Sequence, residues 1–121
     1  MVKQTGKTKL NKRRTGSRYE AIAAKYLEDQ GIMIVERNYH CFQGEIDLIG
    51  KKGELLIFVE VKYRRNEKNG VPSEAVTWQK QQHIRRTAQY YLYSHRYGEI
   101  PCRFDVVGIL GKEIRWIQDA F

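Results

Sequence analysis

The sequence has few of the residues that stabilise secreted or membrane-bound proteins. Its 121 residues include only two cysteines, Cys41 and Cys102, which form no CxxC pair or other dense pattern. No apolar run approaches the roughly 20 residues that a membrane helix requires, and the basic N-terminus lacks the apolar stretch of a signal peptide. These absences argue against a disulfide scaffold and predict a cytoplasmic protein with no membrane segment.

Motifs for common cofactors are also absent. The sequence contains no GxxxxGK or GxGxxG motif, so nothing in it indicates nucleotide hydrolysis or a dinucleotide cofactor. The three histidines, His40, His83 and His95, have no cysteine or carboxylate at ligand spacing, which favours surface positions over a zinc site. The length fits one domain with a small core, and therefore one functional site.

Acidic residues are missing from the first 18 positions, which hold seven lysines and arginines. The rest of the chain has 15 basic and 14 acidic residues, so the net charge of +8 comes almost entirely from this segment. Basic segments are attracted to polyanions because counterions are released on binding. We predict a flexible basic arm at residues 1–16, with Lys12, Arg13 and Arg14 contacting nucleic acid, and a single domain at residues 17–121. The alternative is a solvated tail that only keeps the protein in solution.

Hydrophobic periodicity predicts two helices and five strands. Ser17 and Glu20 have the spacing of a capping box ahead of a helix over residues 18–30, and a second helix begins after Ser73 or Thr77 and ends near His95. Strands are predicted at residues 32–35, 45–50, 55–63, 103–110 and 114–117, with an irregular or strand-like connection at residues 38–43. This order predicts an α/β protein with a mixed sheet and two helices.

The hairpin between the second and third strands determines where several charged residues lie. A two-residue type II′ turn that begins at Gly53 pairs Lys52 with Leu55. Asp47 then faces Glu60, and Glu45 faces Lys62. These charged residues share one face of the hairpin, and the opposite face is apolar: Ile46, Leu48, Ile57, Val59 and Val61. A four-residue loop over residues 50–53 would instead shift the register and separate the two carboxylates.

The facing carboxylates of Asp47 and Glu60 predict a cation site. Two such groups repel each other unless they share a proton or a cation. Mg²⁺ prefers hard oxygen ligands and keeps part of its water shell. The Lys62 ammonium on the same face could polarise an attacking water or offset charge on phosphorus. The alternative is an ordinary solvent-facing sheet in which Glu45 and Lys62 form a cross-strand ion pair.

Asp47 and the segment Glu60-Val61-Lys62 match the D…(D/E)xK arrangement of the PD-(D/E)XK nuclease superfamily, with Ile46 in place of the usual proline. From about residue 16 to residue 110 the chain resembles the YraN-like family of small bacterial proteins in that superfamily. The segments that carry the resemblance are residues 44–49, residues 58–64, Lys80 and residues 103–107.

The resemblance implies a restriction endonuclease-like αβββαβ core, with a mixed central sheet flanked by two helices. It implies that Glu20 joins Asp47 and Glu60 in binding Mg²⁺ or Mn²⁺, and that Lys62 is the catalytic lysine. Lys80 matches a basic or amide residue that the superfamily often sends from the second helix. For Glu20 the alternative is a purely capping role, and for Lys80 a solvated position in the first helical turn.

Together these observations predict a metal-dependent endonuclease acting on DNA or RNA, with Arg64, Arg65 and Lys68 as phosphate contacts at the end of the third strand. One alternative is a non-catalytic nucleic-acid-binding module of a repair or RNA-processing assembly. Another is an interaction protein whose arm contacts a ribosome or nucleoid. Superfamily relatives that cut both strands often pair two copies, so a homodimer is compatible with the prediction. Several aromatic residues in or just after the second helix could also stack on bases: Trp78, Tyr90, Tyr91, Tyr93 and Tyr97. Of these, Tyr91 lies on the packed stripe of the helix.

Overall fold

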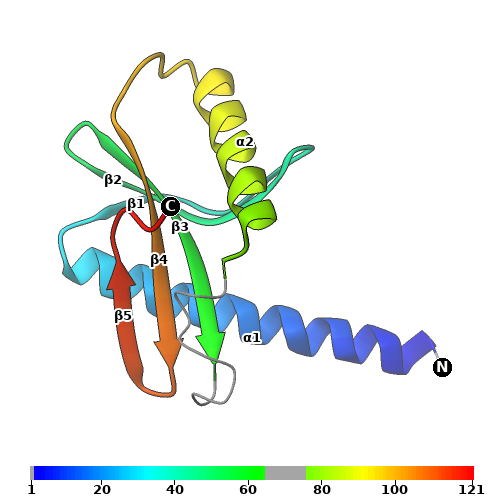
Figure 1. Cartoon of the computed structure of the whole chain (residues 1–121). Coiled ribbons are helices and arrows are strands. Elements are labelled where there is room, and N and C mark those ends of the chain that lie inside the picture. The colour runs from blue at the N-terminus through cyan, green and yellow to red at the C-terminus, as the bar shows by residue number, and fades with distance from the viewer. Residues whose placement is uncertain (1, 65–75) are drawn as a thin grey trace.

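The computed structural model describes the backbone of residues 2–64 and 76–121, and the side chains from residue 16 onward within these ranges. It contains two helices and a five-stranded sheet (Figure 1). The elements are α1 Val2–Asp29, β1 Met33–Cys41, β2 Gly44–Lys52, β3 Leu55–Arg64, α2 Trp78–Ser94, β4 Cys102–Leu110 and β5 Glu113–Ile117. The order of elements is the predicted one. Arg65 and Lys68, predicted to contact phosphates, lie outside the described residues.

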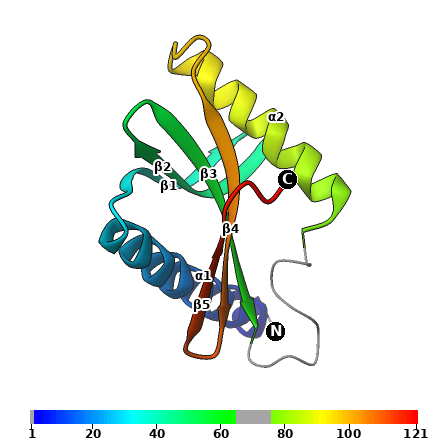
Figure 2. The ribbon, with the colours of Figure 1, turned by 60° about the vertical axis from the view of Figure 1, so that its left-hand side comes forward.

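The sheet has the strand order β1-β2-β3-β4-β5 and is mixed. The pairs β1–β2, β2–β3 and β4–β5 are antiparallel, whereas β3 and β4 are parallel. A parallel pair needs a crossover connection, and the segment that contains α2 provides it. The two helices cover opposite faces of the sheet (Figures 1 and 2). The prediction of an α/β fold is confirmed, and the arrangement is consistent with a restriction endonuclease-like core.

Each helix packs on its own hydrophobic cluster, so the central strands are buried on both faces. On the α1 side, Leu27 packs with Leu48 and Val59, and on the α2 side, Ile84 packs with Phe58. All five side chains are at most 2% exposed. Burying one side chain of this size contributes roughly 1.5–3 kcal/mol. This double coverage explains why β3 reads as an almost unbroken apolar run.

Helix α1 begins at Val2, so the predicted start near residue 18 is wrong. Ser17 and Glu20 lie inside the helix and do not form a capping box. No proline interrupts residues 2–17, and the helix can therefore extend through them. The flexible arm at residues 1–16 stays a prediction. At α2 the start is as predicted for Thr77, whose hydroxyl accepts a hydrogen bond from the backbone N–H of Lys80 at 3.1 Å.

The two hairpins differ in how well the sequence predicted them. Between β2 and β3, Lys52 pairs with Leu55 and Gly53 has a φ of 60°, so the two-residue turn is confirmed and the four-residue loop is excluded. The first strand was predicted at residues 32–35, followed by an irregular or strand-like connection at residues 38–43. In the structure β1 is one strand that continues to Cys41. It does so with a bulge between Ile34 and Glu36, which lets a strand bend without ending.

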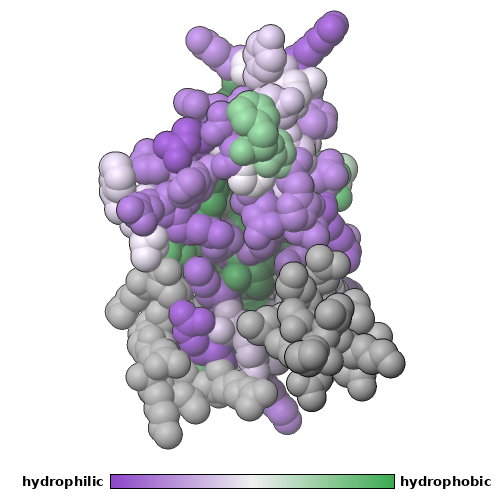
Figure 3. All heavy atoms as spheres, turned by 90° about the vertical axis from the view of Figure 1, so that its right-hand side faces the viewer, coloured by the Kyte–Doolittle hydropathy of each residue, from purple (hydrophilic) through white to green (hydrophobic). Residues whose placement is uncertain are grey.

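The described part of the chain has no helix that is long and apolar enough to cross a membrane. The side of the molecule toward which the N-terminal end of α1 points is covered mainly by hydrophilic side chains (Figure 3). Both edge strands of the sheet, β1 and β5, lie away from β3, whose C-terminal half carries the predicted acidic and basic residues. The candidate site is therefore built around the centre of the sheet.

Candidate active site

The candidate site lies where β2 and β3 stop pairing. The last pair of their ladder is Leu48 with Val59, so the predicted strand pairs of Asp47 with Glu60 and of Glu45 with Lys62 lie beyond it. In place of a ladder bond, the Asp47 Oδ2 atom accepts a hydrogen bond from the Val61 backbone N–H at 2.8 Å. This bond satisfies the Val61 donor and fixes the Asp47 carboxylate at the point of separation.

A change of face in β2 accompanies this separation. Ile46 packs in the cluster under α2, whereas Leu48 packs in the cluster under α1, so the prediction that both share one apolar face is wrong. The paired strand β1 is irregular at the same level, because Asn38, between the partners of Leu48 and Ile46, has a left-handed φ of 54°. Asparagine tolerates this conformation, which alternation of side chains along a regular strand does not anticipate.

Asp47 and Glu60 form a carboxyl pair at this position. Glu60 is 6% exposed, and its carboxyl group lies close enough to that of Asp47 to affect its titration. Burial raises the pKa of Asp47 to about 8, and the hydrogen bond to Glu60 and its negative charge act in the same direction. The Val61 N–H opposes this rise. The raised pKa of Asp47 therefore favours one proton on the pair near neutral pH.

Two lysines approach the same Glu60 oxygen from different elements. The Lys62 Nζ atom, at the end of β3, lies 3.7 Å from Glu60 Oε2, and the Lys80 Nζ atom, in the first turn of α2, lies 3.5 Å from it. The Glu45–Lys62 ion pair of the alternative interpretation is absent from the described ion pairs, and His40 Nδ1 lies 3.3 Å from Glu45 Oε2 instead. Lys80 is thus part of the site, and a position facing only solvent is excluded for it.

Glu20 approaches this group from α1. Partial burial raises the pKa of Glu20, and the negative charges of Glu45 and Glu60 raise it further, while His40 lowers it. Glu20 also lines a polar cleft of about 570 Å³ together with Asn38, His40 and Glu45. The helix therefore brings Glu20 within electrostatic reach of the carboxyl pair, and its side chain faces an open cleft.

The donor set suits a magnesium-like ion held by few protein ligands. In the described ranges, no group of three or more histidine, cysteine, aspartate or glutamate side chains is arranged to hold a metal ion. Mg²⁺ is commonly bound by one or two carboxylates and keeps waters and substrate phosphates as its other ligands. Asp47 and Glu60 match that requirement, because a cation would take the place of their shared proton.

The structure describes the side chains of only some residues that are predicted to contact nucleic acid. Arg64 is partly buried, and its Nη1 atom donates to the Tyr63 carbonyl at 3.1 Å. Its buried Nε atom has no hydrogen-bond partner among the described residues. Lys12, Arg13 and Arg14 lie in α1, in the part of the helix where the backbone alone is described. Phosphate contact by these residues stays a prediction.

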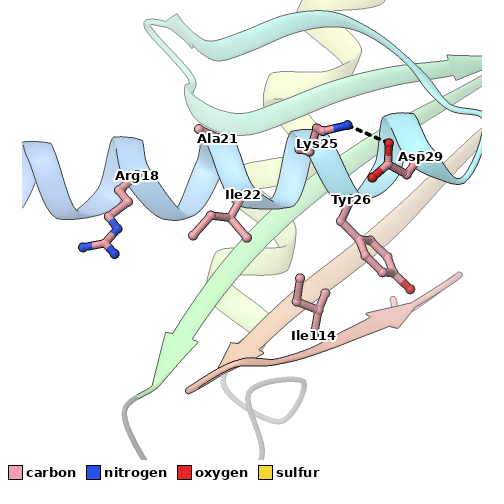
Figure 4. A pocket seen from close by; sticks show the side chains of 7 residues that line it. All are labelled: Arg18, Ala21, Ile22, Lys25, Tyr26, Asp29 and Ile114. Atoms are coloured by element: carbon pink, nitrogen blue, oxygen red, sulfur yellow. Dashed lines mark hydrogen bonds and ion pairs between the residues drawn. The ribbon is translucent and has the colours of Figure 1, made fainter.

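A second, apolar groove lies on another face of α1, away from the carboxyl pair (Figure 4). Ile22 and Tyr26 of α1 face Ile114 of β5 there. Its polar residues include the exposed ion pair between Lys25 Nζ and Asp29 Oδ1, at 2.9 Å. The groove contains one carboxylate that is already paired, so it lacks the chemistry of the candidate site.

Sequence reasoning missed two features of the site. The contact of His40 with Glu45 escaped it because the two residues meet only through the β1–β2 register, in which they are direct partners. The bond from Val61 to Asp47 escaped it because regular pairing was extended beyond Leu48.

The fold and the site define an α/β protein with two helices on a five-stranded mixed sheet, consistent with a restriction endonuclease-like core and with a carboxylate–lysine cluster at the end of a strand pair. The sequence pattern of the uncharacterised protein family UPF0102 matches residues 19–109. The chain belongs to this family, and the YraN-like resemblance is confirmed.

Curated relatives match over nearly the whole chain. The UPF0102 protein of Lachnoclostridium phytofermentans is 51% identical over 113 residues, which cover 93% of this chain and 96% of the relative. The UPF0102 protein of Saccharophagus degradans is 44% identical over 108 residues, which cover 88% and 92%. That of Stutzerimonas stutzeri is 42% identical over 112 residues, which cover 88% and 93%. The chain is thus similar to these relatives along almost their full length.

Proposed function

We propose that the protein is a metal-dependent nuclease that hydrolyses phosphodiester bonds in DNA or RNA. The observation that carries the proposal is the Asp47–Glu60 carboxyl pair with two lysine Nζ atoms within 4 Å of one Glu60 oxygen. Buried like charges are costly, and a fold keeps them together chiefly where they do chemistry. The resemblance to the PD-(D/E)XK superfamily assigns the same residues to that chemistry.

Asp47 and Glu60 would hold Mg²⁺ or Mn²⁺, and Glu20 would approach the ion from the cleft on the α1 side. When bound, the ion would supply Lewis acidity and a lower pKa of a coordinated water. Asp47 is held in place by the Val61 N–H, so its carboxylate needs no reorganisation to receive a cation. Glu60 is fixed between two strands and two lysines.

The lysines would act on the substrate. Hydrolysis adds a water oxygen to phosphorus and releases a sugar hydroxyl, and negative charge grows on the phosphate oxygens on the way. Lys62 would orient the attacking water or offset that charge, because it is only partly exposed and its ammonium carries three donors. Lys80, whose Nζ atom lies 3.5 Å from Glu60 Oε2, would contact a neighbouring phosphate.

Basic residues outside the carboxyl pair would contact the nucleic-acid backbone. Lys12, Arg13 and Arg14 of α1 would hold the nucleic-acid backbone, with Arg64, Arg65 and Lys68 near the site as further phosphate contacts. A homodimer would place two such sites on the two strands of a duplex. A cytoplasmic location belongs to the same proposal.

A cleavage assay on labelled single-stranded, duplex and branched oligonucleotides with Mg²⁺ or Mn²⁺ tests the function. The near-isosteric variants Glu60→Gln and Asp47→Asn should each lower the rate by about 100-fold or more. Glu113→Gln is the matched control, because this exposed glutamate in β5 pairs only with Arg115 in the described structure, and it should cut like the wild type. Equal cleavage by all four proteins would contradict the proposal and point to a contaminating nuclease.

A second candidate function is a non-catalytic nucleic-acid-binding module. It is favoured by the finding that the described residues hold no metal-binding group of three or more side chains, and by the lysines that already neutralise Glu60. In that case, Asp47→Asn and the wild type would bind oligonucleotides equally and neither would cut. Cleavage that depends on Asp47 would exclude this function.

A further inference from the structure

The outer face of α2 is basic, aromatic and free of acidic residues. The 17 residues of the helix include Lys80, Arg85 and Arg86 and no aspartate or glutamate. Its inner stripe, which contains Ile84 and Tyr91, is buried against the sheet. Lys80 contacts Glu60 and Arg85 lies over the Phe104 and Phe121 rings, whereas Arg86 is exposed. Arg86 is therefore available for a negatively charged partner.

Large aromatic side chains are exposed on this face. Trp78 at the start of α2 is 71% exposed and Tyr93 near its end is 82% exposed. Phe42, in the turn between β1 and β2, is 79% exposed and lies with its ring centre 5.0 Å from that of Tyr90. Of the four most exposed large hydrophobic residues described, only Met33 lies elsewhere. Figure 3 shows a hydrophobic patch among hydrophilic side chains on the side of the molecule where the β1–β2 turn lies.

The exposed face begins beside the candidate active site. Lys80, which lies 3.5 Å from Glu60, follows Trp78 by two residues in the same helical turn. Trp78 then borders a shallow pocket that runs along the helix past Gln82 and His83 to Arg86. From Trp78 to Tyr93 the helix rises roughly 22 Å, which is long enough to follow several nucleotides of an extended strand.

We propose that the outer face of α2 binds unpaired nucleotides, with a base stacked on Trp78 and a phosphate held by Arg86. Bases can stack on an aromatic ring only when they are not already stacked inside a duplex, and such stacking is tolerant of sequence. Amides such as Gln82 can bond to base edges or phosphates. A protein partner with an apolar helix fits less well, because basic and amide side chains separate the exposed aromatic rings.

The consequence for the substrate rests on the proposed nuclease function. A single-stranded segment that leaves this face at Trp78 would pass around the first turn of α2 to reach Lys80 and the carboxyl pair. The substrate class is therefore DNA or RNA that carries unpaired nucleotides next to the cleavage point, such as a flap, an overhang or a single strand. A blunt duplex would use only the phosphate contacts.

Fluorescence anisotropy with labelled oligo-dT, oligo-U and a blunt duplex of equal length tests this inference, with EDTA present so that binding is measured without cleavage. The wild type should bind both single strands more tightly than the duplex. Trp78→Ala should weaken single-strand binding about tenfold, as loss of one stacked base does, and Trp78→Phe should restore most of it. Arg86→Ala should reduce the slope of log affinity against log salt concentration by about one. Lys112→Ala, which removes the same charge in the exposed β4–β5 turn, is the control and should have little effect.

Intrinsic fluorescence gives an independent readout. The protein has two tryptophans, and Trp116 is partly buried with its indole N–H bonded to Asp105 at 2.8 Å. Oligo-dT should therefore quench the emission of Trp78, and the quenching should disappear in Trp78→Phe.

The inference and the proposed function fail in different ways. Equal single-strand binding by the wild type and Trp78→Ala, or tighter binding to the duplex, would overturn the inference even if Asp47-dependent cleavage is found. Trp78-dependent binding without any metal-dependent cleavage would support the inference and remove the nuclease.

Discussion

The sheet carries two buried acidic centres, and they differ in how completely their charge is satisfied. Asp105 in β4 is fully buried and accepts two hydrogen bonds from Arg103 at 2.9 Å, one from the Trp116 indole and one from the Asp119 backbone N–H. The Asp47–Glu60 pair instead combines two carboxyl groups, and burial together with the negative charge of Glu60 raises the pKa of Asp47. The first centre stabilises the fold, whereas the second is suited to receiving a cation.

The comparison shows why a conspicuous sequence motif alone does not separate the two roles. Asp105 lies in a segment that carries the family resemblance, as Asp47 does. The donors to Asp105 come from β4, from β5 and from the C-terminal residues. Together they give each carboxylate oxygen of Asp105 two hydrogen bonds. Of these two aspartates, only Asp105 has an ion-pair partner of its own among the described residues.

The largest effect should come from breaking the satisfied centre. Asp105→Ala leaves the Arg103 guanidinium and the Trp116 indole N–H without their shared acceptor, so we expect a loss of roughly 3–5 kcal/mol in the free energy of unfolding. Urea denaturation followed by circular dichroism measures this change. A loss below about 1 kcal/mol would mean that Asp105 is less important to the fold than its four bonds indicate.

A near-isosteric substitution at the Asp47–Glu60 pair should have a smaller and opposite effect. The folded-state pKa of Asp47 is raised from 3.8 to about 8, so its contribution to stability is present below pH 4 and is lost as the pH rises through 8. Asp47→Asn keeps an acceptor for the Val61 N–H. Its neutral amide does not ionise, so the variant does not lose this stability as the pH rises. Without metal, it should be more stable than the wild type by about 1–3 kcal/mol at pH 8.

Denaturation of both proteins between pH 5 and pH 8.5, in EDTA, checks the sign. The wild type should lose stability over this range relative to Asp47→Asn. Glu113→Gln, an exposed change, is the control for general effects of removing one negative charge. A wild type that gains stability relative to Asp47→Asn as the pH rises would contradict the shared proton.

The smallest effect should come from the exposed Lys25–Asp29 pair on α1, whose side chains are 74% and 58% exposed. Solvent and salt screen such a pair. Asp29→Asn should therefore leave the midpoint of thermal unfolding unchanged within measurement error. A clear shift would show that surface pairs contribute to this fold and that the contrast between the two buried centres is overstated.

Much of the fold could be predicted because it depends on local patterns. The Lys52–Leu55 turn follows from one glycine, and the double burial of β3 follows from its apolar run. The start of α1 was missed because Ser17 and Glu20 have cap spacing, yet a continuous helix passes through them.

The candidate site could be predicted only in part. The motif places Asp47, Glu60 and Lys62 close together, and the resemblance brings in Lys80, which lies 3.5 Å from Glu60. The left-handed Asn38 and the early end of the β2–β3 ladder depend on contacts between strands, and no pattern within either strand reports them. Those two features determine how the Asp47 carboxylate is held.

The central claim is that a divalent cation replaces the proton shared by Asp47 and Glu60. Calorimetric titration of Mn²⁺ and Mg²⁺ into the wild type at pH 7, in two buffers that differ in ionisation enthalpy, counts the protons released on binding. The account predicts binding with release of up to one proton per ion, and no such release or binding in Glu60→Gln. Binding without proton release, or equal binding by Glu60→Gln, would contradict it.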